Sequence, residues 1–160
     1  MKLFLLRHGE AGRHADDALR ELTPLGEAMA RAAAQILLPD DLRPSVIVSS
    51  PILRARQTAA LAGEVLGGAS IVLSEYLTPY ADHRQIFGLL KKRAEERILL
   101  VGHEPHLSTM VSLLVTGSRS AQYALGVGTL VLIACDGPAG PSAGRLEWIR
   151  SPLDPGTVLP

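Results

Sequence analysis

The sequence is short of cysteine and of aromatic side chains, and it has no surplus of charge of either sign. Cys135 is the only cysteine among 160 residues, which excludes an intramolecular disulfide framework and a zinc site built from several cysteines. Cys135 lies in an apolar run, so we expect a buried, unreactive thiol. Lys+Arg and Asp+Glu both number 16, so the basic surplus typical of nucleic-acid-binding proteins is absent.

Long hydrophobic runs are also missing. No apolar run approaches the roughly 18 residues that a membrane-spanning helix needs, so we expect no membrane association. The N-terminal MKLFLL resembles the start of a signal peptide, but its apolar part is short and Arg7 interrupts it. We therefore expect a cytoplasmic protein. A hydrophobic content of 47% favours a globular chain with a core over a disordered one.

Short apolar runs alternate with helix-like segments along the chain. This alternation is typical of an α/β fold, a three-layer α/β/α sandwich with a mainly parallel sheet. Two later runs and the Gly/Pro-rich segment between them predict an antiparallel C-terminal hairpin. We expect one domain over residues 1–150 and a flexible tail over residues 151–160. The predicted strands cover residues 3–6, 45–50, 70–73, 97–102, 128–136 and 144–150, and the predicted helices cover about 24–37, 51–66, 82–94 and 105–115.

Chemically active side chains follow three of the predicted strands. Arg7 and His8 follow the first strand, Ser49 and Arg54 come at and after the end of the second, and His103 follows the fourth. In an open parallel sheet, ligands bind beyond the carboxyl ends of the strands, so these side chains should converge. Arginine forks match the oxygens of a phosphate, and a neutral histidine can attack phosphorus or transfer a proton. The pattern predicts a phosphate site.

Simpler interpretations exist for the same residues. Arg7 could pair with Glu10, and Arg54 could lie on a solvated helix face. A metal centre is the rival use of two histidines, but it needs three or four ligands. No HxH, HExxH or carboxylate cluster accompanies His8 and His103, so we expect no metal and no cofactor. Gly9 is expected to let the backbone turn sharply and approach a ligand.

Three segments together resemble the histidine phosphatase superfamily, which includes the phosphoglycerate mutases. LLRHGEA resembles its Arg-His-Gly signature, SSPILRARQTA its second signature, and ILLVGHEPHLS its later strand-then-histidine signature. The resemblance runs in order from residue 3 to about residue 117. It implies a phosphoglycerate mutase-like fold, His8 as a nucleophile that becomes phosphorylated, and Arg7, Arg54 and His103 as the phosphate pocket. It also implies a metal-independent reaction that ends in hydrolysis of the phosphohistidine.

The short connection after the third predicted strand indicates which subgroup of the superfamily the chain resembles. Few residues separate Glu75 from the helix near Asp82, which leaves little material for a lid over the site. In this the chain resembles the SixA-type phosphohistidine phosphatases. That resemblance implies a phosphorylated protein of the histidine phosphotransfer type as substrate. The alternative is a phosphatase of small phosphate esters or pyrophosphate-containing metabolites. A non-catalytic phosphate-binding module is a third hypothesis, and a mutase a weaker fourth.

The proton donor is the open question. Ester-cleaving members of the superfamily use a carboxylic acid after the third strand, where Glu75 lies, but the match is loose. An imidazole leaves more readily than an alkoxide, so a phosphohistidine substrate needs less acid catalysis. Asp82, Glu104 and His106 are further candidate donors. His14 and His83 are expected on the surface. Residues expected to contact the substrate besides the phosphate pocket are Gly9, Glu10, Ser49, Glu104 and His106.

Overall fold

The computed structural model describes residues 1–120, 123–153 and 158–159. In this part of the chain the strands form one seven-stranded sheet in the order β3-β2-β4-β1-β5-β6-β7. β1 and β2 each pair with β4 in parallel, and β2 pairs with β3 in parallel, whereas the β1–β5, β5–β6 and β6–β7 pairs are antiparallel. The predicted mainly parallel sheet with an antiparallel C-terminal part is therefore confirmed. The strands are β1 Lys2–Arg7, β2 Val46–Ser49, β3 Ser70–Leu73, β4 Arg97–Gly102, β5 Leu130–Cys135, β6 Gly144–Arg150 and β7 Val158–Leu159.

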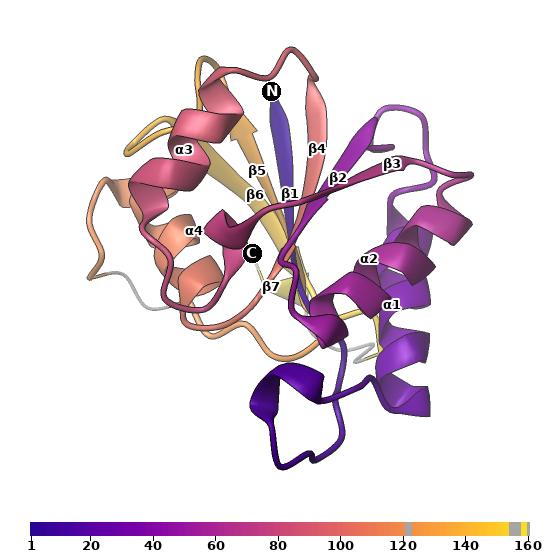
Figure 1. The fold of residues 1–160 in the computed structure, drawn as a ribbon. Coiled ribbons are helices and arrows are strands. Elements are labelled where there is room, and N and C mark those ends of the chain that lie inside the picture. Colours follow the sequence, from indigo (N-terminus) through magenta and orange to yellow (C-terminus); the bar gives the residue numbers. More distant parts are fainter. Residues whose placement is uncertain (121–122, 154–157, 160) are drawn as a thin grey trace.

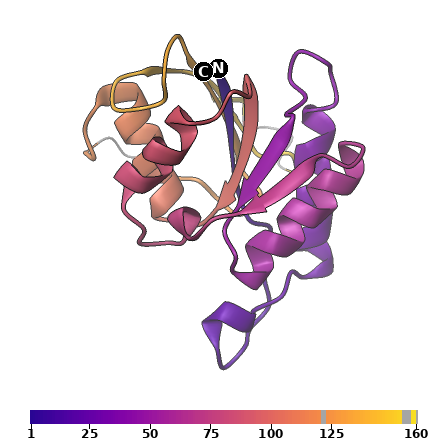
Figure 2. The same cartoon turned by 45° about the horizontal axis from the view of Figure 1, so that its top comes forward.

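Helices cover both faces of the sheet, as Figures 1 and 2 show. Helices α1 (Pro24–Ile36) and α2 (Leu53–Val65) pack on one face, and α3 (His83–Lys91) and α4 (His106–Thr116) on the other. Successive residues of a strand point to opposite faces, so β1 contributes alternate side chains to two separate cores. Both faces of the central strands are buried, which explains their continuous apolar sequence. The predicted three-layer α/β/α sandwich is confirmed.

Local sequence sets several helix boundaries. The Thr23 side chain accepts a hydrogen bond from the Gly26 amide, and Pro24 occupies the first helical position of α1. Helix α2 begins at Leu53, two residues later than predicted, and the Ser50 hydroxyl accepts a hydrogen bond from the Ile52 amide just before it. Helix α4 ends at Thr116 and is followed by Gly117, whose φ of 74° is a left-handed conformation that glycine adopts without strain.

The sheet register brings three strand ends to one edge. Arg7 at the end of β1 is paired with Gly102 at the end of β4, and Ser49 at the end of β2 is paired with Val101. The segments that follow these strands therefore lie side by side, as the sequence predicted. The loop after β1 carries a short 3₁₀ helix, η1 (Asp17–Leu19), and the bridge between Ala11 and Leu22 closes the base of this loop.

The last residues are only partly described. Within the predicted flexible tail, Val158–Leu159 forms β7 and pairs with β6, while residues 154–157 and 160 lie outside the described residues. Cys135 ends β5 and is buried, in agreement with the prediction. In the described part of the chain, no helix has both the length and the apolar character that a membrane span requires.

Candidate active site

His8 directly follows β1, at the edge of the sheet where β1, β2 and β4 end. Its side chain is buried, and its Nδ1 lies 2.7 Å from the Gly9 carbonyl oxygen. Because a carbonyl only accepts hydrogen bonds, Nδ1 carries the proton and donates it, and Nε2 is left with a lone pair. That lone pair accepts a hydrogen bond from Arg54 Nε at 3.2 Å. The backbone thus fixes the tautomer in which Nε2 is the nucleophilic atom.

The surroundings of His8 keep its imidazole neutral. Burial is the largest of the effects that lower the pKa of His8 to about 4. The positive charges of Arg54, Arg7 and Arg20 act in the same direction, and the hydrogen bond to Gly9 opposes them. An imidazole with this pKa is almost entirely unprotonated near neutral pH. A neutral histidine beside several cations can attack an electron-poor centre that carries negative charge, such as a phosphoryl group.

Arg54 comes from the first turn of α2 and is also buried. The Thr58 hydroxyl, one helical turn later, donates to the Arg54 carbonyl at 2.8 Å and accepts from the Gly9 amide at 3.1 Å. Thr58 therefore joins α2 to the loop that carries the nucleophile. The bond to the Arg54 carbonyl is the back-bond that a helical threonine commonly makes to the residue four positions earlier, so the sequence alone did not single out Thr58.

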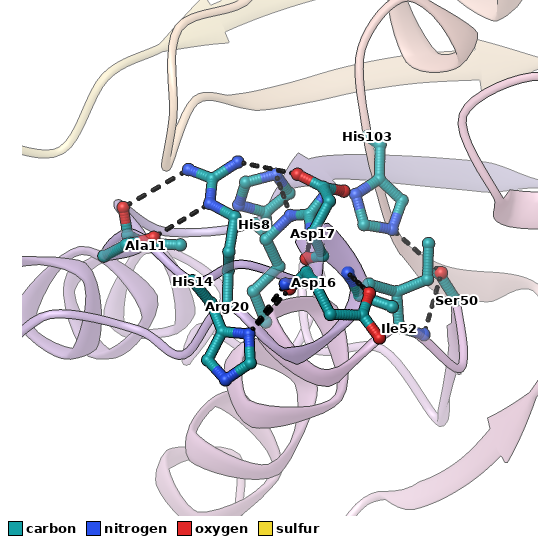
Figure 3. Close-up of polar contacts among 12 residues, drawn as sticks. His8, Ala11, His14, Asp16, Asp17, Arg20, Ser50, Ile52 and His103 are labelled. Carbon is teal, nitrogen blue, oxygen red and sulfur yellow. Dashed lines mark hydrogen bonds and ion pairs between the residues drawn. The ribbon is translucent and has the colours of Figure 1, made fainter.

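His103 directly follows β4 and faces His8, with ring centroids 5.0 Å apart. Its Nε2 lies 2.8 Å from the Ser50 hydroxyl, while its buried Nδ1 has no partner among the described residues. In Figure 3 the free nitrogen lies on the side of the ring that faces His8 and Asp17. Burial and the neighbouring His8 and Arg54 lower the pKa of His103 to about 3. A buried, unpaired nitrogen beside a nucleophile is the kind of group that a bound ligand satisfies.

Arg7 supplies the second guanidinium of the site. Its Nη1 donates to the Leu125 carbonyl at 2.7 Å, and its buried Nε has no partner in the described structure. Burial lowers the pKa of Arg7, and the Glu104 carboxylate partly offsets this effect. The structure therefore brings Arg7, His8, Arg54 and His103 together, and leaves unpaired polar atoms on two of them.

The loop after β1 adds two residues that the sequence analysis missed. Asp17 accepts hydrogen bonds from Arg54 through its backbone carbonyl at 2.8 Å and through its carboxylate at 3.1 Å. Arg20 donates to the other oxygen of the Asp17 carboxylate at 3.2 Å (Figure 3). The Arg20 hydrogen bond and the nearby Arg54 charge lower the pKa of Asp17. These residues lie in a segment without helical or strand periodicity, so no local pattern indicated their position.

Three residues expected to contact the substrate make packing or hydrogen-bond contacts within the protein. A Cβ on Gly9 would overlap with the backbone of Gly26, so Gly9 permits close packing against α1. The Glu10 carboxylate accepts a hydrogen bond from the Thr23 hydroxyl at 2.9 Å, next to the start of α1. Ser49 is fully buried, and its hydroxyl donates to the Ser50 carbonyl. The neighbouring Ser50, rather than Ser49, contacts a histidine of the site.

The candidate proton donors lie in different places. Glu75 begins the short helix η2 (Glu75–Leu77) and is exposed, on a cavity of about 400 Å³ that residues of η1 and α2 also line. The Arg84 side chain holds the pKa of Asp82 at about 2, so Asp82 stays ionised. Glu104 accepts a hydrogen bond from the Ser108 amide in the first turn of α4. Within the described residues, the hydrogen bonds of the His8 ring go to Gly9 and Arg54, and none goes to these carboxylates.

Of the two histidines that were predicted to lie on the surface, only one does. His14 is exposed, as expected, but His83 is buried, so its predicted surface position is wrong. His83 stacks on His106 with ring centroids 4.0 Å apart and an interplanar angle of 9°, and its Nε2 donates to the His106 carbonyl at 2.9 Å. This stack places the His106 ring against α3. A polar position at a helix start predicted exposure, but packing of α3 against α4 covered it.

Taken together, the site presents a neutral imidazole nucleophile flanked by the buried Arg54, the half-buried Arg7 and a second neutral histidine. Such a set can bind a phosphoryl group, accept it on His8 Nε2, and neutralise the charge on its three other oxygens. Among the described residues no group of three histidine, cysteine or acidic side chains lies close enough together to hold a metal ion.

Comparisons with known proteins agree with this chemistry. A model of the histidine phosphatase superfamily (branch 1) matches residues 3–78. An uncharacterized protein of Picosynechococcus sp. is 32% identical over 123 residues, which cover 73% of this chain and 74% of that protein. The phosphohistidine phosphatase SixA of Escherichia coli (strain K12) is 28% identical over 160 residues, which cover 96% of each chain.

Solved structures extend the similarity to the whole fold. The structure of the protein histidine phosphatase SixA complexed with tungstate superposes with a TM-score of 0.83 at 26% identity, and the match covers 96% of this chain and 99% of that one. The fold, the three strand-end motifs and the matched family model point to the same relatives. The chain belongs to the histidine phosphatase superfamily, branch 1.

Proposed function

We propose that this protein removes the phosphoryl group from phosphohistidine in a signalling or carrier protein. One observation carries the proposal. His8 is neutral, and its Nε2 lone pair accepts a hydrogen bond from Arg54. Arg54 in turn donates to Asp17, which is the carboxylate linked to His8 through this hydrogen-bond network. Arg20 and Arg54 lower the pKa of Asp17, so this group is ionised near neutral pH and cannot supply a proton. A substrate with a good leaving group fits such a site.

The reaction would proceed in two displacements at phosphorus. In the first, His8 Nε2 forms a bond to phosphorus as the N–P bond of the substrate breaks, and the departing imidazole keeps the electron pair and takes a proton from solvent. In the second, water attacks phosphorus, the Nε2–P bond breaks, and the proton from water passes to solvent. Arg7, Arg54 and His103 would hold the phosphoryl oxygens throughout, where charge develops in the transition state.

Two further features support a protein as the substrate. Only residues 74–82, which include η2, connect β3 to α3, so the cover over the site is small. Two relatives that match nearly the whole chain are named a phosphohistidine phosphatase and a protein histidine phosphatase. An open site admits a phosphohistidine that projects from a folded partner. The proposal names no particular partner protein, and it implies no cofactor.

A side-by-side turnover assay tests this function. Wild type and His8→Ala would be compared on a phosphohistidine-bearing carrier protein, on phosphoramidate and on simple phosphate esters. We expect wild type to prefer the N–P substrates, to form acid-labile phosphate on His8, and to lose both properties in His8→Ala. Full activity in His8→Ala would refute the mechanism. Equally fast hydrolysis of esters would instead favour a small-metabolite phosphatase, and Glu75 would then be the first candidate for its acid.

A further inference from the structure

Arg54 uses two different edges of its guanidinium group. A guanidinium carries five N–H donors in one plane, so it can pair along its Nη1/Nη2 edge and also along its Nε/Nη2 edge. The Nη1/Nη2 edge is occupied by Asp17, which accepts from Nη1 through its backbone oxygen at 2.8 Å and from Nη2 through its carboxylate at 3.1 Å. The Nε/Nη2 edge points the other way, with Nε 3.2 Å from His8 Nε2. One edge is anchored, and the other faces the nucleophile.

Asp17 is itself held in place. Arg20 donates to the Asp17 carboxylate, and its remaining donors reach back to the Gly12 carbonyl at 2.8 Å and the Ala11 carbonyl at 3.3 Å. The Asp16 side chain caps η1 through the Ala18 amide at 3.0 Å. Figure 3 shows this continuous set of contacts from the base of the loop through Arg20 to Asp17. The loop is therefore braced at the point where it contacts Arg54.

Burial indicates what Asp17 contributes. The Arg54 side chain is 6% exposed, whereas the Asp17 side chain is 69% exposed. Solvent screens the charge of an exposed carboxylate, so its Coulomb interaction with a distant phosphoryl group is weak. Its hydrogen bonds to a buried guanidinium restrict where that group can point. The effect of Asp17 on the reaction should therefore come from geometry more than from charge.

We propose that Asp17 is a positioning residue, which fixes the Nη1/Nη2 edge of Arg54 so that the Nε/Nη2 edge stays directed at a phosphoryl group on His8. The inference rests on the proposed function, because it assigns Asp17 a role in that same phosphoryl transfer. A freely rotating guanidinium would spend part of its time away from the equatorial oxygens. A fixed guanidinium stabilises the transition state without reorganisation.

Two substitutions of Asp17 separate geometry from charge. Asp17→Asn and Asp17→Ala both remove the negative charge, but only the asparagine keeps a side-chain oxygen that can accept from Arg54 Nη2. On a phosphohistidine-bearing protein we expect kcat/KM of Asp17→Asn within about three-fold of wild type, and that of Asp17→Ala about ten-fold below Asp17→Asn, mainly through kcat. Glu21→Gln removes one charge from the same loop at an exposed position and should leave turnover unchanged.

Equal kcat/KM values for Asp17→Asn and Asp17→Ala would overturn the inference, whether both fall or both rise. Thermal melts of each variant check folding, and Asp17→Leu, which also has no side-chain acceptor, replaces Asp17→Ala if the alanine variant melts early. Tungstate affinity provides a readout that needs no turnover. If wild type does not hydrolyse phosphohistidine, the proposed function fails, and tungstate then decides the inference alone. Several-fold tighter binding by Asp17→Asn than by Asp17→Ala supports positioning, and equal binding refutes it.

Discussion

The buried imidazoles of His8, His103 and His106 should make the folded protein sensitive to acid. Burial is the main cause that lowers their pKa values, to about 4 for His8 and about 3 for His103 and His106. In the unfolded chain each returns to about 6.5. Between these values the unfolded state binds more protons than the folded state, so the free energy of unfolding falls as the pH falls.

The magnitude follows from this difference in protons bound. From about pH 7 to about pH 5.5, one such imidazole costs about 1.3 kcal/mol, because the unfolded histidine becomes largely protonated while the folded one does not. Three imidazoles together cost about 4 kcal/mol, a large share of the roughly 5–15 kcal/mol by which a domain is usually stable. His83, whose pKa burial also lowers, acts in the same direction.

Urea unfolding at the two pH values measures the effect directly. His106→Phe should keep the aromatic stack on His83 but remove one titrating group, so it should reduce the pH dependence by about 1.3 kcal/mol. His14→Gln, at an exposed position, should leave the dependence unchanged. The reasoning would be refuted if wild type were equally stable at both pH values, or if His106→Phe kept the full dependence.

Three further predictions concern the site and its support. Gly26→Ala places a Cβ on the Glu10 carbonyl, so we expect the variant to lose at least about 2 kcal/mol of stability or to fail to fold, which thermal melts would show. Thr58→Val keeps the side-chain shape but removes the hydrogen bond to the Gly9 amide; we expect a loss of about 1–3 kcal/mol and several-fold slower turnover, and unchanged values would contradict the role of Thr58. Glu75→Gln should leave hydrolysis of phosphohistidine within about two-fold of wild type, since an imidazole leaving group needs little acid catalysis; a large loss would identify Glu75 as the acid.

The functional proposal depends on a combination of features rather than on any one of them. A buried histidine, a pair of arginines or an open loop is ordinary when found alone. Here the register of the sheet aligns the ends of β1, β2 and β4, so that His8, Arg54 and His103 meet at one edge. Hydrogen bonds then assign each group a state, with His8 unprotonated at Nε2 and Arg54 held between His8 and Asp17. This assignment distinguishes a reactive site from a cluster of polar side chains.

The sequence alone was sufficient for the features that depend on local patterns. Continuous apolar runs separated by helical periodicity predict a parallel sheet covered on both faces, and in such a sheet the strand ends form one rim. These patterns are enough to place Arg7, His8, Arg54 and His103 together at that rim. The antiparallel hairpin of β5 and β6 follows in the same way, because two strand-like runs flank a Gly/Pro-rich segment.

Tertiary structure decided what depends on contacts between distant segments. His83 has a polar local sequence, yet packing of α3 on α4 buries it against His106. Gly9 is required by its approach to Gly26, seventeen residues later, and no local rule predicts that neighbour. The contact of Asp17 with Arg54 joins an irregular loop to a helix 37 residues away. The periodicity of a sequence indicates which face of a helix or strand is buried. Which distant residue packs against that face depends on the packing of the whole chain.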